Sequence, residues 1–390
     1  MRVLAGVRVL ELGGFITGPY AGMMLAEFGA DVVKVEKPGV GDPFRKTVDA
    51  VPSAEFRAYN WHKRSVTLDY ATPAGRDVLR LLCEQADVLI LNARPGVARA
   101  MGIDFATVHD WNSRLVYCEI SGFGTTGPYS RRPAFDTVGQ ALSGWLSLFQ
   151  DDDDPRIAGP AACDMVTGMF AANGVLAALY ERERSGVGRH VELSMLGAMM
   201  AFNGEPLGRY LTDGQTSDRF TRGSFSQAFV FTCRDGRRLA IHMSSPEKFW
   251  RGLLQAIGRP ELGEDSRFND RSRRNVHYEA LGRELKEAFF LRDRDAWIAL
   301  LETHDVPFAP VYAVDEVASD PHVATQDAVV RLPHTRLGEI AGVRRPVYFD
   351  GDRAIDHGAP PDLGQDTAAV LREIGLSQAD VDGLREQGVV

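Results

Sequence analysis

The chain has 390 residues, of which 44% are hydrophobic and 25% charged, and it carries a formal net charge of −9. This composition is typical of a globular enzyme, and the length favours two domains. The acidic balance, with no dense basic run, excludes a protein that binds duplex DNA through its phosphates. The four cysteines are widely spaced, which excludes a zinc ribbon, a thioredoxin-type pair and a disulfide scaffold.

The first residues lack the apolar core of a signal peptide, and no apolar stretch is expected to reach membrane-spanning length. We therefore expect a cytoplasmic protein. Short β-branched runs then alternate with helical patterns. Strands are predicted at 8–12, 29–36, 87–91, 115–120 and 190–193, with helices at 19–28 and 72–85 among those between them. This alternation predicts an α/β fold with a largely parallel sheet covered on both faces.

The clearest helical pattern begins after Asp164 and ends before Gly186. Asp164 follows the small, flexible run 158–162. An aspartate in this position can be a cap that accepts hydrogen bonds from free backbone amides. It can also be a carboxylate that is left free at a helix N-terminus to act as a nucleophile. Local sequence alone favours the cap, because most aspartates before helices do only this.

The pattern changes near Tyr210, where the polar, glycine-bearing segment 211–226 predicts a crossing between domains. A predicted hairpin over 229–243 is followed by helical patterns at 246–257, 277–290 and 293–303. These elements predict a second, smaller α+β domain. The segments 343–349 and 366–375 could return the chain to the first domain.

Several common catalytic motifs are absent from the sequence. There is no phosphate-binding P-loop, no G-x-S-x-G elbow, no H-E-x-x-H, and no metal-ligand spacing among the nine histidines. No metal site is therefore expected. The turn 13–19 lacks both the G-x-G-x-x-G spacing and an acidic residue at the ribose distance, so a dehydrogenase is disfavoured. A turn at which backbone approaches a ligand remains open.

Ordered sequence blocks run along the whole chain. They lie at 6–12, 18–22, 29–36, 63–69, 94–96, 121–129, 140–144, 164–188, 306–311, 320–322 and 384–390. Through these blocks the chain resembles the class III CoA-transferases of the CaiB/BaiF type, which include formyl-CoA transferase and the carnitine CoA-transferases. The related α-methylacyl-CoA racemases share the same fold.

The resemblance implies that Asp164 is the nucleophile. Its carboxylate would attack an acyl-CoA thioester to form a mixed anhydride, and the returning thiolate would give an aspartyl-CoA thioester that the acceptor acid attacks. A helix dipole would hold the anion, and backbone amides would stabilise each oxyanion. Gln140 matches a transferase active-site position and could hydrogen-bond the acyl intermediates.

The resemblance also implies a set of residues around CoA, which is the only cofactor expected. They are Phe15, Ile16, Thr17, Lys37, Arg64, Asn92, Ala93, Arg94 and Met101. It implies a large Rossmann-like domain (1–210 and 331–390), a small α+β domain (211–330) and an interlocked homodimer. The expected partners are acyl-CoA and a carboxylic acid, with no nucleic acid and no membrane.

Transferase and racemase differ at two positions. Phe135 stands where the racemases have a histidine, and Phe229 lies near their second acid. Phenylalanine cannot exchange protons, so both positions favour a transferase. The alternatives are an acyl-CoA racemase or epimerase that uses Asp164 as its base, and a catalytically silent CoA-binding protein. The segment 221–227 falls where transferases carry a mobile loop, and Arg131, Arg132 and Arg222 could bind the second carboxylate of a diacid.

Overall fold

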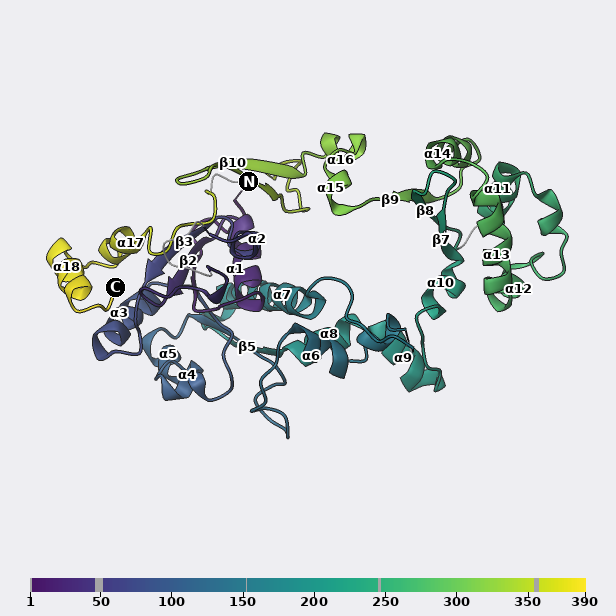
Figure 1. The fold of residues 1–390 in the computed structure, drawn as a ribbon. Coiled ribbons are helices and arrows are strands. Elements are labelled where there is room, and N and C mark those ends of the chain that lie inside the picture. The colour runs from purple at the N-terminus through teal and green to yellow at the C-terminus, as the bar shows by residue number, and fades with distance from the viewer. Residues whose placement is uncertain (1, 46–51, 152, 245–246, 354–357) are drawn as a thin grey trace. The chain divides into compact units, whose positions relative to one another are not determined.

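The computed structural model describes residues 2–45, 52–151, 153–244, 247–353 and 358–390 (Figure 1). The chain packs into two compact units. The larger comprises Met1–Leu146, Ile157–Gly204 and Asp327–Val390, and the smaller comprises Ser147–Arg156 and Glu205–Gln326. The domains predicted from the sequence, with changes after 210 and 330, stay a prediction. The compact units divide near these positions and place Ser147–Arg156 in the smaller unit.

The larger unit is built on a six-stranded sheet in which every neighbouring pair is parallel, which confirms the predicted α/β class. The spatial order is β3-β2-β1-β4-β5-β6. The strands are β1 (Arg8–Glu11), β2 (Asp31–Glu36), β3 (Lys63–Thr67), β4 (Val88–Leu91), β5 (Val116–Ser121) and β6 (His190–Ser194). The chain moves outward from β1 to β3 and then returns to place β4 beside β1. The strand order therefore reverses between β1 and β4, which is where open α/β sheets bind ligands.

Both faces of this sheet are covered by helices, because successive side chains of each strand point to opposite faces. Leu10 packs in one core with α3 (Pro73–Glu84), α17 (Thr367–Glu373) and α18 (Gln378–Glu386). Its neighbour Val9 packs in the other core with α1 (Thr17–Glu27) and α7 (Ala162–Ser185). The remaining helices of this unit are α2 (Ala54–Tyr59), α4 (Val97–Ala100), α5 (Phe105–Trp111), α6 (Asp136–Leu142) and α8 (Met195–Phe202).

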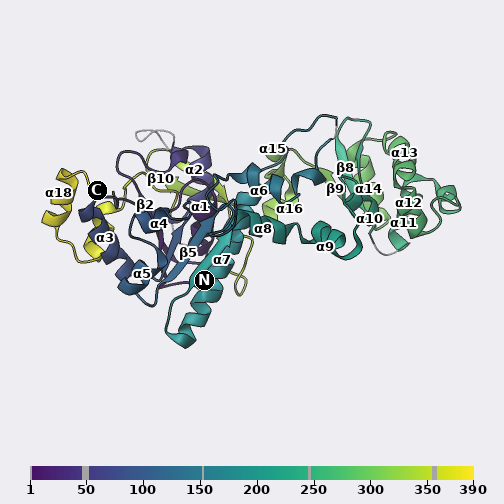
Figure 2. The ribbon, with the colours of Figure 1, turned by 90° about the horizontal axis from the view of Figure 1, so that it is seen from below.

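Helix α7 corrects one expectation from the sequence. With 24 residues it is long and apolar enough to cross a membrane by length and composition, so the expectation that no stretch reaches that length is wrong. In the structure, however, α7 is a core helix that lies beside β5 and packs on α1 (Figure 2). Half of its most apolar window is buried against the unit.

A hairpin of β10 (Val329–His334) and β11 (Gly338–Val343) packs on α1 through Met23, Trp61, Val330 and Ile340. This hairpin was not predicted from the sequence, since its strands carry polar residues and Pro333. It closes one side of a cavity that Tyr20 and Trp61 also line.

The smaller unit holds a three-stranded antiparallel sheet of β7 (Ala228–Thr232), β8 (Arg238–His242) and β9 (Phe308–Val311). Strands β7 and β8 form the predicted hairpin. The predicted helices appear as α11 (Glu247–Ile257), α13 (Tyr278–Phe289) and α14 (Arg294–Thr303), and position 246 lies outside the described residues. The segment expected as a mobile loop contains a short helix, α10 (Thr221–Ser226). Phe229 is buried in this unit's core.

Candidate active site

The candidate site lies where the ends of β1 and β4 meet. The turn 13–17 follows β1, and the segment 92–95 follows β4. Asn92 joins the two segments: its Oδ1 accepts from the Gly14 amide at 3.0 Å, and its Nδ2 donates to the Gly14 carbonyl and Thr17 Oγ1, each at 2.8 Å. These bonds hold a turn in which Phe15 has a φ of 62°, a left-handed conformation that is uncommon outside glycine.

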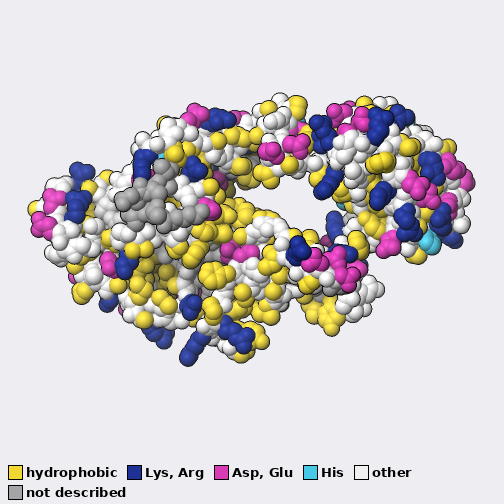
Figure 3. Space-filling view, viewed as in Figure 1, with side chains coloured by type: hydrophobic (Ala, Val, Ile, Leu, Met, Phe, Trp, Pro, Cys, Tyr) yellow, Lys and Arg dark blue, Asp and Glu magenta, His cyan; other side chains and the backbone are white. Residues whose placement is uncertain are grey.

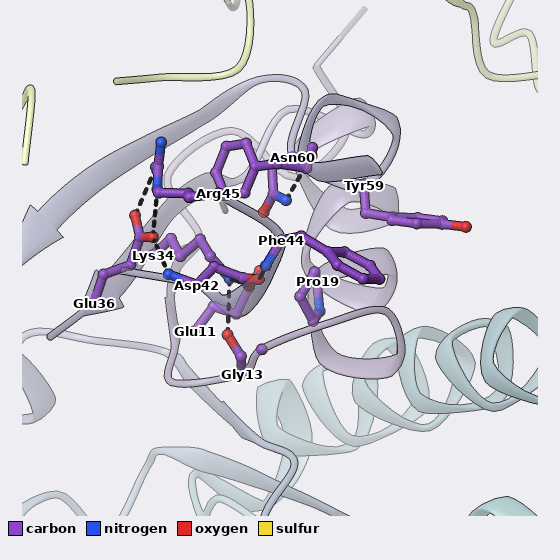
Figure 4. A network of polar contacts seen from close by, with 12 residues as sticks. Glu11, Gly13, Pro19, Lys34, Glu36, Asp42, Phe44, Arg45, Tyr59 and Asn60 are labelled. Atoms are coloured by element: carbon purple, nitrogen blue, oxygen red, sulfur yellow. Dashed lines mark hydrogen bonds and ion pairs between the residues drawn. The ribbon is translucent and has the colours of Figure 1, made fainter. Parts of the chain in front are cut away.

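A buried network of charged groups lies beneath this turn (Figure 4). Lys34 Nζ contacts Glu11 Oε1 at 2.8 Å, Asp42 Oδ2 at 2.9 Å and the Gly13 carbonyl at 2.7 Å. Because buried charges are costly unless they are paired, this arrangement fixes the end of β1 strongly.

Lys63 extends the network to α1 and α2. Its Nζ lies 2.7 Å from Glu11 Oε2 and donates to the carbonyls of Pro19 (2.7 Å) and Tyr59 (2.8 Å). Burial lowers the pKa of Lys63 to about 8, although Glu11 opposes this shift. The network therefore positions both the turn after β1 and the end of α2.

Asp164 is the third residue of α7, and it does not cap that helix. The N-cap residue is Ala161, which has no side-chain oxygen to accept a hydrogen bond. The cap is instead Asp136 of α6, whose Oδ1 accepts from the backbone amides of Cys163 (2.9 Å) and Asp164 (3.2 Å). The interpretation of Asp164 as a helix cap is therefore wrong, because a residue distant in sequence takes that role.

Close packing brings α6 to the start of α7. A Cβ at Gly139 would lie 2.3 Å from Cys163 Sγ, so only glycine permits this approach. Gln140, on the same helix and nearly fully buried, donates from Nε2 to Asp136 Oδ2 at 2.5 Å. Gln140 thus orients Asp136, and it is absent from the residues that line the pocket around Asp164.

The environment of Asp164 raises the pKa of its carboxyl from the ordinary 3.8 to about 7, through burial first and the nearby charge of Asp136 second. Burial and the charge of Asp136 act against the dipole of α7, which the sequence predicted would hold the anion. Among the residues that the structure describes, none donates a hydrogen bond to the Asp164 carboxylate. A carboxylate of raised pKa without bound donors is a better nucleophile than an ordinary one.

Asp164 lines a pocket of about 260 Å³ at the switch point between β1 and β4. Six of the nine residues predicted to surround CoA line it as well: Phe15, Ile16, Thr17, Asn92, Ala93 and Arg94. Arg132 and Phe135 complete part of the wall. The fold thus brings the predicted nucleophile and most of the residues predicted to contact CoA to one pocket.

Three predicted cofactor residues lie outside this pocket. Lys37 is exposed just after β2, and Met101 packs against the core beneath α3. Arg64 donates from Nε to Asp31 Oδ1 at 2.8 Å and from one terminal nitrogen to Glu373 Oε1 at 2.7 Å. Through these bonds the Arg64 guanidinium links β2 to α17.

A second, larger cavity beside the same helix was not predicted from the sequence. It has a volume of about 820 Å³ and is lined by Tyr20, Tyr59, Trp61 and Met165, together with residues of β11. Its lining comes from segments that are far apart in the chain, so no local sequence pattern predicts it. Over the residues that the structure describes, no group of three His, Cys, Asp or Glu side chains is placed to hold a metal ion.

Comparisons with known proteins show which family the chain resembles over its whole length. The model of CoA-transferase family III matches residues 4–367. The succinyl-CoA–D-citramalate CoA-transferase of Chloroflexus aurantiacus is 31% identical over 400 residues, covering 100% of this chain and 98% of the relative. The formyl-CoA:oxalate CoA-transferase of Shigella sonnei is 31% identical over 417 residues, covering 99% of each chain. The crystal structure of a CaiB/BaiF family protein from Brucella suis matches with a TM-score of 0.83 at 30% identity, covering 95% of this chain and 99% of that one.

Proposed function

The chain belongs to CoA-transferase family III, and we propose that it moves CoA from an acyl-CoA donor to a carboxylic acid through covalent intermediates on Asp164. The observation that carries this proposal is that Asp136 caps α7 in place of Asp164. The Asp164 carboxylate is left in the wall of the pocket that six of the nine expected CoA residues also line.

The proposed reaction has four steps that balance in bonds and charge. An Asp164 oxygen attacks the thioester carbonyl, the C–S bond breaks, and CoA thiolate leaves a mixed anhydride. The thiolate then attacks the Asp164 carbonyl carbon, which releases the donor acid and forms an aspartyl-CoA thioester. The acceptor carboxylate attacks this thioester and expels thiolate, forming a second anhydride. Thiolate finally attacks the acceptor's carbonyl, which releases the new acyl-CoA and restores the Asp164 carboxylate.

Charge and aromatic surface support CoA as the occupant of the smaller pocket. Arg94 and Arg132 line it, and guanidinium groups suit phosphate. The ring of Phe15 is substantially exposed and offers an apolar surface at the same wall. Lys37, Arg64 and Met101 stay predictions as CoA contacts, with the geometry of Arg64 favouring a structural role.

A racemase or epimerase remains the second candidate enzyme, with Asp164 as its base. Such a reaction needs an acid-base group on each side of the exchanged proton. Phe135 lines the pocket near Asp164, and Asp136 is engaged with the amides of α7. These features favour transfer over racemisation. A silent CoA-binding protein, the third candidate, does not explain why no described residue donates a hydrogen bond to the Asp164 carboxylate.

We further propose that the protein is an interlocked homodimer that acts in the cytoplasm. Large hydrophobic side chains are exposed on α6, α7 and α8 of the larger unit, and Figure 3 shows hydrophobic surface in that region. They include Val138, Met169, Phe170, Tyr180, Met200 and Phe202. Apolar surface of this kind marks an interaction site.

The direct test of the proposed function is transfer by the Asp164→Ala variant. We expect a loss of at least about a thousandfold in kcat with bound CoA retained, because the variant keeps the pocket and lacks the nucleophile. Solvent deuterium at the α-carbon of the acyl group without an acceptor acid would support the racemase instead. Substantial transfer by Asp164→Ala would reject the mechanism.

A further inference from the structure

We propose that the 820 Å³ cavity beside Asp164 holds the acyl group during transfer, and that the substrate acid has a large apolar body, aromatic or alkyl. This inference rests on the proposed function of Asp164. It assigns the two cavities beside the start of α7 to the two parts of an acyl-CoA: CoA in the smaller pocket and the acyl body in the larger cavity.

The packing of α7 on α1 sets Asp164 between the two cavities. A Cβ at Gly168 would lie 2.9 Å from the Thr17 carbonyl and 3.0 Å from the Tyr20 ring, so these helices touch closely there. Asp164 precedes Gly168 by four residues and lies on the same face of α7. Thr17 lines the smaller pocket and Tyr20 lines the larger cavity. Asp164 therefore lies beside the segment of α1 that separates them.

A row of aromatic rings connects the cavities along this boundary. Ring centroids are 6.1 Å apart for Tyr20 and Tyr59, 6.3 Å for Tyr59 and Phe44, 5.5 Å for Phe44 and Phe15, and 5.8 Å for Phe15 and Phe135. The charge of Asp164 also acts on Tyr59: burial first, and this carboxylate second, raise the pKa of the Tyr59 hydroxyl. The surface between the two cavities is therefore aromatic.

The cavity's lining suits an apolar group. Trp61 packs closely against β11, where a Cβ at Gly342 would stand 2.4 Å from the indole. Met23, Met165 and Ile340 add further apolar surface. A volume of about 820 Å³ is in the range of drug-sized ligands and far exceeds what formate or oxalate fills.

Charged side chains also line the cavity. Glu339 and two of the three arginines have partners within the protein, whereas the Arg57 side chain has none among the described residues. Arg344 Nε lies 3.3 Å from Asp327 Oδ2, and Arg345 donates to the Glu27 carbonyl. Burial raises the pKa of the Glu27 carboxyl to about 7, with Arg345 opposing it, so near neutral pH Glu27 is close to half uncharged. A diacid whose second carboxylate binds these arginines is the competing occupant, and the experiment below separates the two.

The test compares four CoA thioesters as donors to the whole enzyme with one acceptor acid. Phenylacetyl-CoA and hexanoyl-CoA carry apolar bodies, whereas acetyl-CoA is small and succinyl-CoA carries a second carboxylate. We expect the two apolar donors to exceed succinyl-CoA in kcat/KM by about tenfold or more. A preference for succinyl-CoA would overturn the inference.

A variant that fills the cavity sharpens the test. Ala58 is exposed on α2 and lines the cavity. Ala58→Trp should lower kcat/KM for phenylacetyl-CoA about tenfold and leave acetyl-CoA within about twofold. Ala54→Trp, at the start of the same helix, is the second variant should the first fail to fold. Ala296→Trp, at an exposed position of α14 in the smaller unit, is the matched control and should change neither donor.

The outcomes also separate this inference from the proposed function. Equal effects of Ala58→Trp on all four donors, or no effect on any, would reject the cavity as the acyl site. If hydroxylamine traps an intermediate on Asp164 with acetyl-CoA but with none of the other three donors, Asp164 remains the nucleophile and the cavity is rejected as the acyl site. Failure of all four donors to modify Asp164 would reject the proposed function itself.

Discussion

The Asp136 carboxylate accepts a hydrogen bond from the backbone amide of Asp164 at 3.2 Å, and this contact determines what Asp164 can do. Asp136 accepts hydrogen bonds from free backbone amides in the first turn of α7, so the Asp164 side chain is not needed as the cap of its own helix. It also places a second negative charge near a carboxylate that burial already disfavours as an anion.

Asp136→Asn should shift the pH dependence of transfer. In the native enzyme kcat/KM should rise as the pH increases through about 7, because Asp164 must be ionised to attack. An asparagine can still accept from the amides of α7, but it removes the charge that raises the pKa of Asp164. The acidic limb should therefore move to lower pH by about one unit. The measurement is kcat/KM across pH 5 to 9, and an unmoved limb would show that Asp136 does not act on Asp164.

Asp164→Asn should stabilise the fold at neutral and higher pH while abolishing transfer. Well below pH 3.8 the Asp164 carboxyl is protonated in both the folded and the unfolded state, so its ionisation does not change the free energy of unfolding. Its folded pKa is raised to about 7, so stability is lost progressively as the pH rises from about 4 to about 7, and the full loss persists above that. The variant lacks this penalty of about 2 kcal/mol, a figure reduced because the side chain is only partly buried.

The measurement for Asp164→Asn is the difference in Tm between variant and native enzyme at pH 4.5 and pH 8. The difference should be small at the lower pH, where only part of the penalty is present, and clearly larger and positive at the higher. Asp77→Asn, on the exposed side of α3, serves as the control. A variant that is less stable than the native enzyme at pH 8 would contradict the assigned environment of Asp164.

Asn92→Ala should raise KM for acyl-CoA more than it lowers kcat. The side chain makes three hydrogen bonds that fix the turn containing Phe15, and their loss frees a turn in the CoA wall. Asn92→Asp should be no better, since a carboxylate cannot donate to the Gly14 carbonyl. Steady-state kinetics with one donor and one acceptor decide this, and a fall in kcat at constant KM would point to a role in chemistry instead.

Arg64→Ala should lower stability by about 1 kcal/mol and leave CoA affinity unchanged, because its guanidinium joins Asp31 to Glu373. Arg94→Ala, in the pocket wall, is the comparison and should weaken CoA binding. Calorimetric titration with CoA measures the affinity of both variants, and thermal unfolding measures their Tm. Weakened binding in Arg64→Ala without a change in Tm would support the role that the resemblance gave this residue.

Local patterns predicted the sheet well where strands are apolar runs, as in β1, β4 and β5. Strand β3 was not predicted as a strand, because Lys63 and Arg64 have the character of surface residues. Their charges are in fact paired with Glu11 and with Asp31 and Glu373, which lie far away in sequence. The hairpin β10–β11 was missed for a related reason: its burial depends on Trp61 and Met23.

The candidate site shows the same division between local and long-range information. Asp164 was located by its position at the start of a helix and by the ordered blocks around it. Its relation to Asp136 depends on the packing of Gly139 against Cys163, which no spacing along the chain reveals. The larger cavity likewise exists only because α1, α2, α7 and β11 come together.

The most direct test of the account is to identify the residue that carries the transferred group. The native enzyme is incubated with an acyl-CoA and hydroxylamine, and in parallel with borohydride, and is then digested for peptide mass spectrometry. The account predicts a hydroxamate, or the reduced alcohol, at Asp164 alone, dependent on acyl-CoA and absent from Asp164→Ala. Modification at another residue, or transfer that proceeds with Asp164 unmodified, would contradict it.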